Sequence, residues 1–157
     1  MADPKADRPY APGYFKQEHT DDILPWSWAV DLMNRVRNVT VSTVRPDGRA
    51  HAMPIWGVWL DGLYCMSTAI TSVKSENLRA NPSCVITSTD GDDSVVLEGR
   101  AEIAPLPDGF TEAYKKKYGE KIDDGPIWVV RPTRAFAFQA NDNFYKTATR
   151  WTFDQRR

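Results

Sequence analysis

The chain has 157 residues, of which 41% are hydrophobic, and a formal net charge of -1 at pH 7. This length fits one domain with a substantial core, and the balanced charge gives no reason to expect a nucleic acid or an anionic membrane as partner. No apolar run approaches the ~20 residues of a membrane span. The N-terminus lacks the apolar core of a signal peptide, so we expect a cytoplasmic protein.

The first part of the chain predicts a flexible arm followed by a helix. Residues 1–20 are rich in Pro, Asp and Lys, so we expect a mobile N-terminal arm, or one that folds onto a partner subunit. We assign residues 21–157 to a single domain. Trp28 and Leu32 recur at helical spacing, which predicts an amphipathic helix with Ser27 as its N-cap.

Most of the remaining chain predicts short antiparallel strands. Alternating β-branched and apolar runs are typical of strands, and turn sequences such as Pro46-Asp47-Gly48-Arg49 and Asp61-Gly62 separate them. Two more helices are predicted, one from about Val73 and one over residues 108–118. The expected strands are residues 38–45, 50–60, 63–68, 84–89, 94–103, 127–130, 135–138 and 148–153, with 131–134 as a connection. This pattern indicates a mainly β fold, an antiparallel barrel with helical decorations.

The second predicted strand contains a proline. Pro54 cannot donate to a ladder, so it indicates either a bulge that leaves backbone groups free for a ligand or an ordinary edge strand. Trp56 and Trp59 are three residues apart, so they lie on opposite faces of this strand.

The segment from Leu63 to Asn81 combines a strand, a hydroxyl-rich loop and the start of a helix. Backbone N–H groups at a helix N-terminus attract anions, and nearby hydroxyls add further donors, those of Ser67, Thr68, Thr71 and Ser72. Lys74 lies in the first helical turn, where a cation is unfavourable unless an anion is present. Two interpretations follow: a phosphate site, or an ordinary serine-capped helix with a solvated lysine.

Other reactive side chains give weaker signals. Cys65 and Cys84 lie in apolar strands and are expected to be buried free thiols. The cysteines and histidines show no recognised ligand spacing, so we expect no metal site. No acid–base pair is visible, so no catalytic residue is assigned, and His51 is interpreted as a structural histidine. The run Lys115-Lys116-Lys117 is interpreted as a solvated helix face.

Several short pieces of sequence occur in a specific order and spacing. They are VRPDGRAH at residues 44–51, PIW at 54–56, ST at 67–68, SVKSENLRANP at 72–82, VLEGRA at 96–101, RPTR at 131–134 and ATRW at 148–151. Together they resemble the split β-barrel flavin- and deazaflavin-binding family that includes pyridoxamine 5'-phosphate oxidase. The resemblance extends from about Asp31 to Phe153. It is closest to the actinobacterial branch that uses coenzyme F-420, the FDOR-B group.

This resemblance implies a homodimeric, Greek-key-like split barrel with the cofactor in a groove between the subunits. It places the phosphate at the strand–loop–helix segment, the ring system against the first two barrel strands, and residues of the last strand across the interface. The implied cofactor-binding residues are Ser42, Thr43, Pro54, Ile55, Trp56, Ser67, Thr68, Ser72, Val73, Lys74, Asn77, Arg150 and Trp151. Val73 stands where the oxidases commonly have an arginine, which weakens the case for flavin mononucleotide (FMN).

The function that the resemblance implies is hydride transfer from reduced coenzyme F-420 to an electron-poor small organic acceptor. No pyridoxamine-phosphate recognition set is visible, so that oxidase activity is not expected. The alternatives are an FMN-dependent oxidase or reductase of the same fold and a non-catalytic carrier of deazaflavin or haem. A structural dimer that binds nothing is a further alternative, which the hydroxyl-and-lysine loop argues against.

Overall fold

The computed structural model describes residues 3–11, 13, 22–120, 122, 125–142 and 144–154. Within these residues the elements follow one another as β1 Lys5–Asp7, α1 Trp26–Arg35, β2 Val39–Val44, β3 Ala50–Leu60, β4 Leu63–Ser67, α2 Val73–Ala80, β5 Ser83–Asp90, β6 Asp93–Ala104, α3 Phe110–Tyr118, β7 Ile127–Gln139, α4 Phe144–Thr147 and β8 Thr149–Thr152. No described helix is long and apolar enough to cross a membrane.

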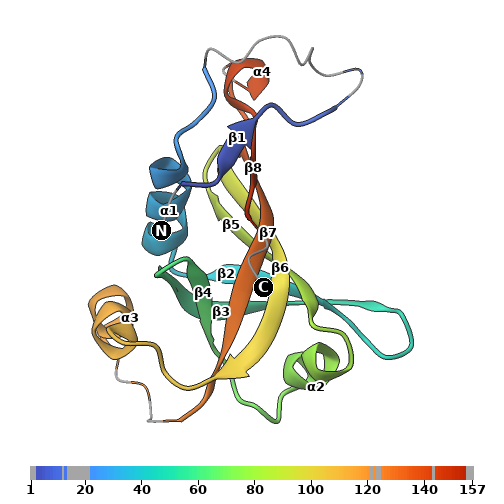
Figure 1. Cartoon of the computed structure of the whole chain (residues 1–157), viewed down its shortest axis with the longest axis vertical. Coiled ribbons are helices and arrows are strands. Elements are labelled where there is room, and N and C mark those ends of the chain that lie inside the picture. Colours follow the sequence, from blue (N-terminus) through green and yellow to red (C-terminus); the bar gives the residue numbers. More distant parts are fainter. Residues whose placement is uncertain are drawn as a thin grey trace.

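The sheet closes on itself as an antiparallel barrel, as the sequence predicts. Its strand order is β1-β8-β7-β4-β3-β2-β5-β6, and a further pairing of β6 with β7 closes a ring of the six described strands from β2 to β7. β8 and β1 extend the sheet beyond this ring. In Figure 1, α1 and α3 lie on one side of the barrel and α2 on the other.

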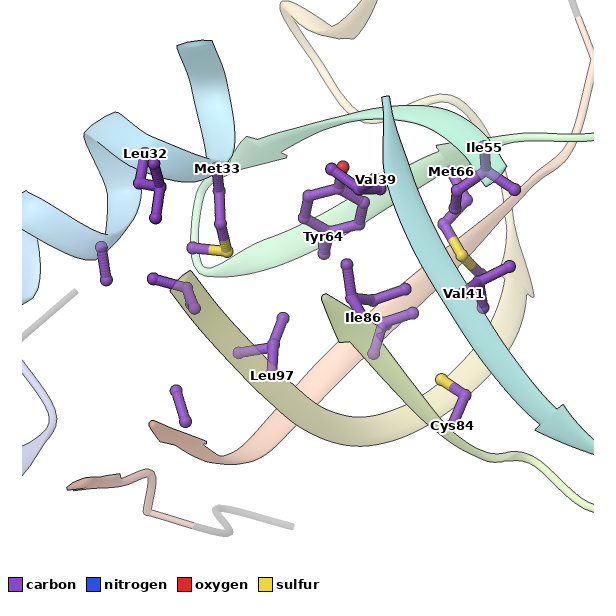
Figure 2. Packing of buried hydrophobic residues seen from close by; sticks show 14 of the residues in the cluster. Leu32, Met33, Val39, Val41, Ile55, Tyr64, Met66, Cys84, Ile86 and Leu97 are labelled. Carbon is purple, nitrogen blue, oxygen red and sulfur yellow. The ribbon is translucent and has the colours of Figure 1, made fainter. Parts of the chain in front are cut away.

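The barrel interior forms the main core. Alternate residues of β2 and β6 point inward, and the buried face of α1 packs over one end of the barrel. Figure 2 shows Leu32 and Met33 of α1 beside interior side chains such as Tyr64, Ile86 and Leu97. Burial of this apolar surface is the main stabilising contribution to such a fold.

A second apolar cluster lies outside the ring, beneath α3. It consists of Val58, Cys65, Phe110, Tyr114, Tyr118, Ile127 and Val129. Neighbouring strand residues therefore serve different clusters: Tyr64 points into the barrel, whereas Cys65 points toward α3. Cys65 and Cys84 are both buried free thiols, which confirms the prediction for them. Burial raises the pKa of each thiol to about 12.

Most predicted elements are confirmed. β3 has the bounds predicted for it, and positive φ angles at Gly48, Asp61 and Gly62 confirm the two tight turns. The prediction of Ser27 as N-cap is wrong, because α1 begins at Trp26 after Pro25 and has no side-chain cap. Pro25 leads directly into the helix, so the predicted cap lies inside it.

The predicted connection at residues 131–134 is also wrong. β7 runs without a break from Ile127 to Gln139, and its register against β6 shifts by one residue between Glu98 and Gly99. A Cβ at Gly99 would lie 2.6 Å from the Arg131 carbonyl oxygen, so glycine permits this close approach. Pro132 lies at the shift, where a bulge tolerates a missing donor.

Pro54 lies at an edge of the sheet. β2 pairs with β3 from Ala50 to Ile55 without a register shift, and β4 pairs with β3 only from Trp56 onward. The edge interpretation is therefore confirmed, and no bulge occurs at the proline. Trp56 and Trp59 join different apolar clusters, which confirms that they lie on opposite faces.

The structure differs from the expected arm within residues 3–11. Lys5–Asp7 pairs with β8 as β1, and the Asp7 carboxylate binds the Arg150 guanidinium at 2.6 Å. Arg8 is buried and donates to the Lys146 carbonyl oxygen at 2.7 Å. Residues 1–2, 12 and 14–20 of the predicted arm lie outside the described residues.

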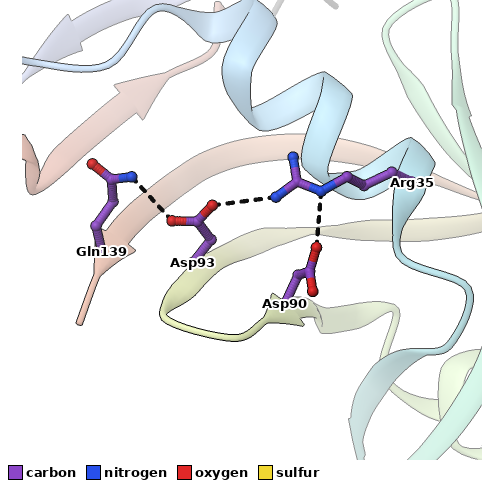
Figure 3. Close-up of polar contacts among 4 residues, drawn as sticks. All are labelled: Arg35, Asp90, Asp93 and Gln139. Atoms are coloured by element: carbon purple, nitrogen blue, oxygen red, sulfur yellow. Dashed lines mark hydrogen bonds and ion pairs between the residues drawn. The ribbon is translucent and has the colours of Figure 1, made fainter. Parts of the chain in front are cut away.

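Polar side chains tie the end of α1 to the β5–β6 turn. Arg35 binds Asp90 at 2.9 Å and Asp93 at 3.2 Å, and Asp93 also accepts from Gln139 (Figure 3). Exposed pairs of this kind are each worth less than about 1 kcal/mol. They orient α1 over the barrel more than they stabilise the fold.

Candidate cofactor site

A cavity of about 290 Å³ lies where β3, β4, α2 and α3 meet. Its lining residues are Asn38, Pro54, Ile55, Trp56, Ser67, Thr68, Lys74 and Tyr114. Six of these were predicted from the sequence as cofactor-binding residues: Pro54, Ile55, Trp56, Ser67, Thr68 and Lys74. The structure thus brings together the edge of β3 and the strand–loop–helix segment, which are separate in the sequence.

The hydroxyl-rich loop is fixed by its own hydrogen bonds. Ser72 is the N-cap of α2 and accepts from the Ser75 N–H, and its hydroxyl lies 3.4 Å from that of Thr68. Ser75 is fully buried, donates to the Ala69 carbonyl oxygen at 2.8 Å and accepts from the Trp128 indole at 2.9 Å. Ser72 and Ser75 therefore shape the loop, while Ser67, Thr68 and Lys74 line the cavity.

Asn77 anchors α2 to the barrel. Its side-chain amide donates to the Thr43 hydroxyl at 3.0 Å, and both residues are buried. Ser42 and Thr43 lie along a different cavity, of about 490 Å³, over β2, β5 and β6. The structure therefore divides the residues predicted to contact the ring system between two cavities. Val73 is 44% exposed and does not line either of them.

Two aromatic residues form a wall of the first cavity. The Trp56 indole donates to the Asn38 side-chain oxygen at 2.9 Å and stacks on Tyr118 with ring centroids 4.7 Å apart. The Arg37 guanidinium lies 4.9 Å from the centroid of the Trp56 ring, and the Tyr114 ring, which also lines the cavity, lies 6.4 Å from the Trp56 ring. Contacts from several elements thus hold this indole in place.

Asn38 and Tyr114 line the cavity but were not predicted. Tyr114 occurs with Phe110 and Tyr118 at helical spacing, a signal that indicates an apolar helix face and not a binding site. Asn38 lies between α1 and β2 and carries no local signal. Tertiary packing brings both residues to the cavity.

Two cations, Arg45 and Lys74, lie near His51, and the first turn of α2 carries both Lys74 and the acidic Glu76. Burial lowers the pKa of His51, and the nearby cations Arg45 and Lys74 lower it further. The His51 ring nitrogen Nδ1 lies 3.4 Å from the Thr43 hydroxyl, outside the lining of the first cavity. Among the residues that line the first cavity, Lys74 is the cation that an anion would meet.

The last predicted site residues lie elsewhere. Trp151 is fully buried in the core of this chain and packs on Trp26, so its ring offers no surface to a ligand. Its predicted role as a cofactor contact is therefore corrected to a core residue. Arg150 is half-buried and paired with Asp7. Its predicted role across a dimer stays a prediction.

The prediction of a solvated face for the lysine run is wrong for Lys117. Its ammonium group donates to the Met33 carbonyl oxygen at 2.8 Å and to the Gly57 carbonyl oxygen at 2.7 Å. Burial lowers the pKa of Lys117 to about 8. Lys115 and Lys116 are exposed, as predicted.

The fold and this cavity define a split β-barrel protein with a cavity beside a helix N-terminus. Residues 29–152 match the family model of pyridoxamine 5'-phosphate oxidase, and the chain belongs to this family. A search of curated proteins finds no match.

Solved structures with the same fold include an F420 reductase, which is 26% identical over 67% of this chain and 93% of that one, with a TM-score of 0.56. The conserved hypothetical protein Rv2991 from Mycobacterium tuberculosis is 23% identical over 80% of this chain and 91% of that one, with a TM-score of 0.66. A haem-binding protein from Mycobacterium smegmatis is 20% identical over 72% of this chain and 53% of that one, with a TM-score of 0.57. The last two show similarity of fold alone.

Proposed function

We propose that this protein is a coenzyme F-420-dependent oxidoreductase of the FDOR-B group. Reduced deazaflavin would transfer hydride to an electron-poor small organic acceptor. The observation that carries the proposal is the cavity that joins the edge of β3 at Pro54 to Trp56 with Ser67, Thr68 and Lys74. The similarity of the chain to the F420 reductase supports the choice of deazaflavin as cofactor.

The polar end of the cavity suits a phosphodiester. Lys74 is the cation among the lining residues, and Ser67 and Thr68 add hydroxyl donors. A phosphate monoester such as that of FMN carries a charge of about -1.5 to -2 at pH 7, whereas the phosphodiester of F-420 carries one negative charge. The exposed apolar Val73 adds no second cation, which favours the diester.

The other end of the cavity suits a planar ring. From Ala50 to Ile55, β3 has a strand neighbour on one side only, so the exposed backbone edge at Pro54 can meet the polar edge of a ring system. Trp56 and Tyr114 would cover the ring and limit the access of water. The cofactor supplies the hydride chemistry when bound, and these residues position it.

A second copy of the chain is part of the proposal. The large apolar side chains of Val44, Met53, Ile70 and Val73 are 38–44% exposed and come from β2, β3 and the region where α2 begins. Exposed apolar side chains are typical of an interface where they form one patch, and we propose that a second copy of the chain covers these four. Light scattering on the purified protein should give the mass of a dimer, and a monomer would contradict this part of the proposal.

The decisive experiment is a fluorescence titration of the apo protein with F-420 and, separately, with FMN. Tighter binding of F-420 would support the proposal and justify a screen of enone and tetrapyrrole acceptors. Tighter binding of FMN would assign the protein to the flavin-dependent alternative. Binding of F-420 without turnover of any acceptor would indicate a carrier.

Lys74→Ala tests the phosphate end of the site. It should weaken F-420 binding about ten- to a hundredfold, because a charge-assisted hydrogen bond contributes about 1.5–3 kcal/mol. Lys115→Ala is the matched control, since Lys115 is exposed and does not line the cavity. Unchanged affinity in Lys74→Ala would contradict the placement of the phosphate beside Lys74.

A further inference from the structure

β3 changes its strand partner halfway along its length. β2 ends its pairing at Val39, opposite Ile55, so from Trp56 onward β3 has β4 on one side and no strand on the other. An open edge leaves backbone N–H and C=O groups without ladder partners, and such groups are costly when buried. In this protein, side chains take the place of the missing strand.

Two consecutive residues of α3 bind the peptide groups of Gly57. The Gly57 N–H donates to the Tyr118 hydroxyl oxygen at 2.8 Å, and the same hydroxyl donates to the Gly57 carbonyl oxygen at 2.9 Å. The Lys117 ammonium donates to that carbonyl oxygen at 2.7 Å. We call this set of contacts of Lys117 and Tyr118 with Gly57 the Gly57 clamp.

The Gly57 clamp also reaches α1. Lys117 donates to the Met33 carbonyl oxygen at 2.8 Å, in the last turn of α1, where a cation is favourable against the helix dipole. Asn34 of the same helix accepts the next outward N–H of the edge, that of Trp59, at 3.0 Å. Side chains from α1 and α3 thus satisfy the edge of β3 together.

The residues held by the Gly57 clamp are neighbours of the cavity wall. Trp56 precedes Gly57 in the chain, and its ring stacks almost parallel on Tyr118, at an interplanar angle of 9°. Tyr114 lies one helical turn before Tyr118, and both Trp56 and Tyr114 line the cavity. A shift of α3 against the edge of β3 would therefore move both aromatic walls.

We propose that Lys117 and Tyr118 are positioning residues, which hold Trp56 and Tyr114 in place for binding by attaching α3 to the open edge of β3. Their effect on cofactor affinity rests on the proposed function, whereas their effect on Trp56 does not. Preorganisation of a binding wall increases affinity because less ordering remains to occur on binding.

The test uses two conservative variants and one control. Tyr118→Phe removes the hydroxyl and keeps the ring that stacks on Trp56, and Lys117→Met removes the donor and keeps much of the stem. Lys115→Met is the control, because Lys115 is exposed on the same helix and makes no contact with Gly57. Thermal unfolding verifies that each variant is folded, and Lys117→Met serves if Tyr118→Phe is not.

Hydrogen exchange in the apo protein is the first measurement. The Gly57 amide and the Trp56 indole N–H should exchange roughly fivefold faster in Tyr118→Phe, because the loss of one hydrogen bond allows the wall to open more often. Lys117→Met should accelerate the Trp56 indole N–H. Wild-type rates at Trp56 in both variants would overturn the proposal, whether or not the protein binds any cofactor.

The titration with F-420 is the second measurement. Each variant should bind roughly three- to tenfold more weakly than Lys115→Met and the wild type. Faster exchange with unchanged affinity would reduce the clamp to a purely structural role and overturn the positioning proposal. If the wild type binds neither F-420 nor FMN, the proposed function fails, and the exchange rates at Trp56 alone decide whether the clamp holds the wall.

Discussion

α2 and α3 border the same cavity but are attached to the barrel in different ways. α2 is fixed near its start by buried, neutral hydrogen bonds: Ser75 accepts from Trp128, and Asn77 donates to Thr43. α3 is fixed near its end by Lys117, which donates to the Gly57 carbonyl oxygen of β3, and by Tyr118, whose ring stacks on Trp56. The attachment of α2 places Lys74 at the cavity, beside the N-terminus of that helix. The attachment of α3 places the aromatic rings of Trp56 and Tyr114 there.

This difference follows from what each helix must cover. The Ser75 hydroxyl lies in a fully buried position, where each polar group needs a partner, so a small side chain with both a donor and an acceptor serves well. α3 must satisfy one strand edge from outside the barrel. Long side chains with polar ends, Lys and Tyr, reach that edge and cover apolar surface with their stems and rings.

We expect the largest loss of stability from a substitution at Gly57, the residue to which α3 is attached. In Gly57→Ala, the new Cβ would lie 2.6 Å from the Cys65 carbonyl oxygen and 2.6 Å from the Tyr64 ring. We expect the free energy of unfolding to fall by about 3 kcal/mol, the upper end for overpacking, because backbone and a buried ring oppose the methyl group. Urea unfolding measures this loss.

Gly125→Ala is the control for that variant, because an added Cβ meets nothing within 4 Å there and the backbone does not require glycine. It should change the stability by less than about 0.5 kcal/mol. Equal stability of Gly57→Ala and Gly125→Ala would mean that the strand edge can shift without cost, against the close contacts around Gly57.

Ser75→Ala breaks the α2 attachment. It leaves the Trp128 indole N–H without an acceptor in a buried position and removes the donor to the Ala69 carbonyl oxygen. We expect a loss of about 2 kcal/mol in the free energy of unfolding, since an unsatisfied buried group costs about 1–3 kcal/mol. Ser83→Ala is the matched control, because Ser83 is exposed at the start of β5. A loss no larger than that of Ser83→Ala would show that the buried indole has found another partner.

The two helices also differ in how far the sequence predicts them. The start of α2 is visible because its cap and lysine lie within a few residues of one another, and local patterns predict local contacts. The bounds of α3 are equally visible, but its function depends on Gly57, which lies 60 residues before Lys117 and 61 before Tyr118. A lysine run and an apolar face give no indication of such a partner.

The same distinction explains the other outcomes. The turns at Gly48 and Asp61 were predictable because positive φ has a local chemical signature. The continuity of β7 through Pro132 was not, because it depends on the register against Gly99 of another strand. The family resemblance implies a role for Trp151 across a subunit interface, whereas its packing on Trp26 makes it a core residue of this chain.

The smallest expected effect concerns the charge on Lys117. Its pKa is lowered by burial from 10.5 to about 8, so above pH 8 the folded protein releases a proton that the unfolded chain keeps until about pH 10.5. The unfolded state then binds more protons, and stability must rise with pH across this window. Below pH 8 both states are protonated, and the cost of burying the charge is constant. The two buried cysteines act in the opposite direction above about pH 9, because unfolding releases their thiols to ionise.

Comparison of the wild type with Lys117→Met cancels the contribution of the cysteines, which both proteins share. Between pH 8 and 9, the free energy of unfolding of the wild type should gain up to about 1 kcal/mol relative to the variant, because one pKa unit corresponds to about 1.4 kcal/mol and solvent reaches part of the side chain. Urea unfolding at pH 7, 8 and 9 measures the difference, and Lys115→Met should follow the wild type. A constant difference over this range would mean that Lys117 keeps its proton, with the two carbonyl oxygens of the clamp and α1 compensating for burial. The α3 attachment would then be a permanent ion–dipole contact, in contrast to the neutral hydrogen bonds that hold α2.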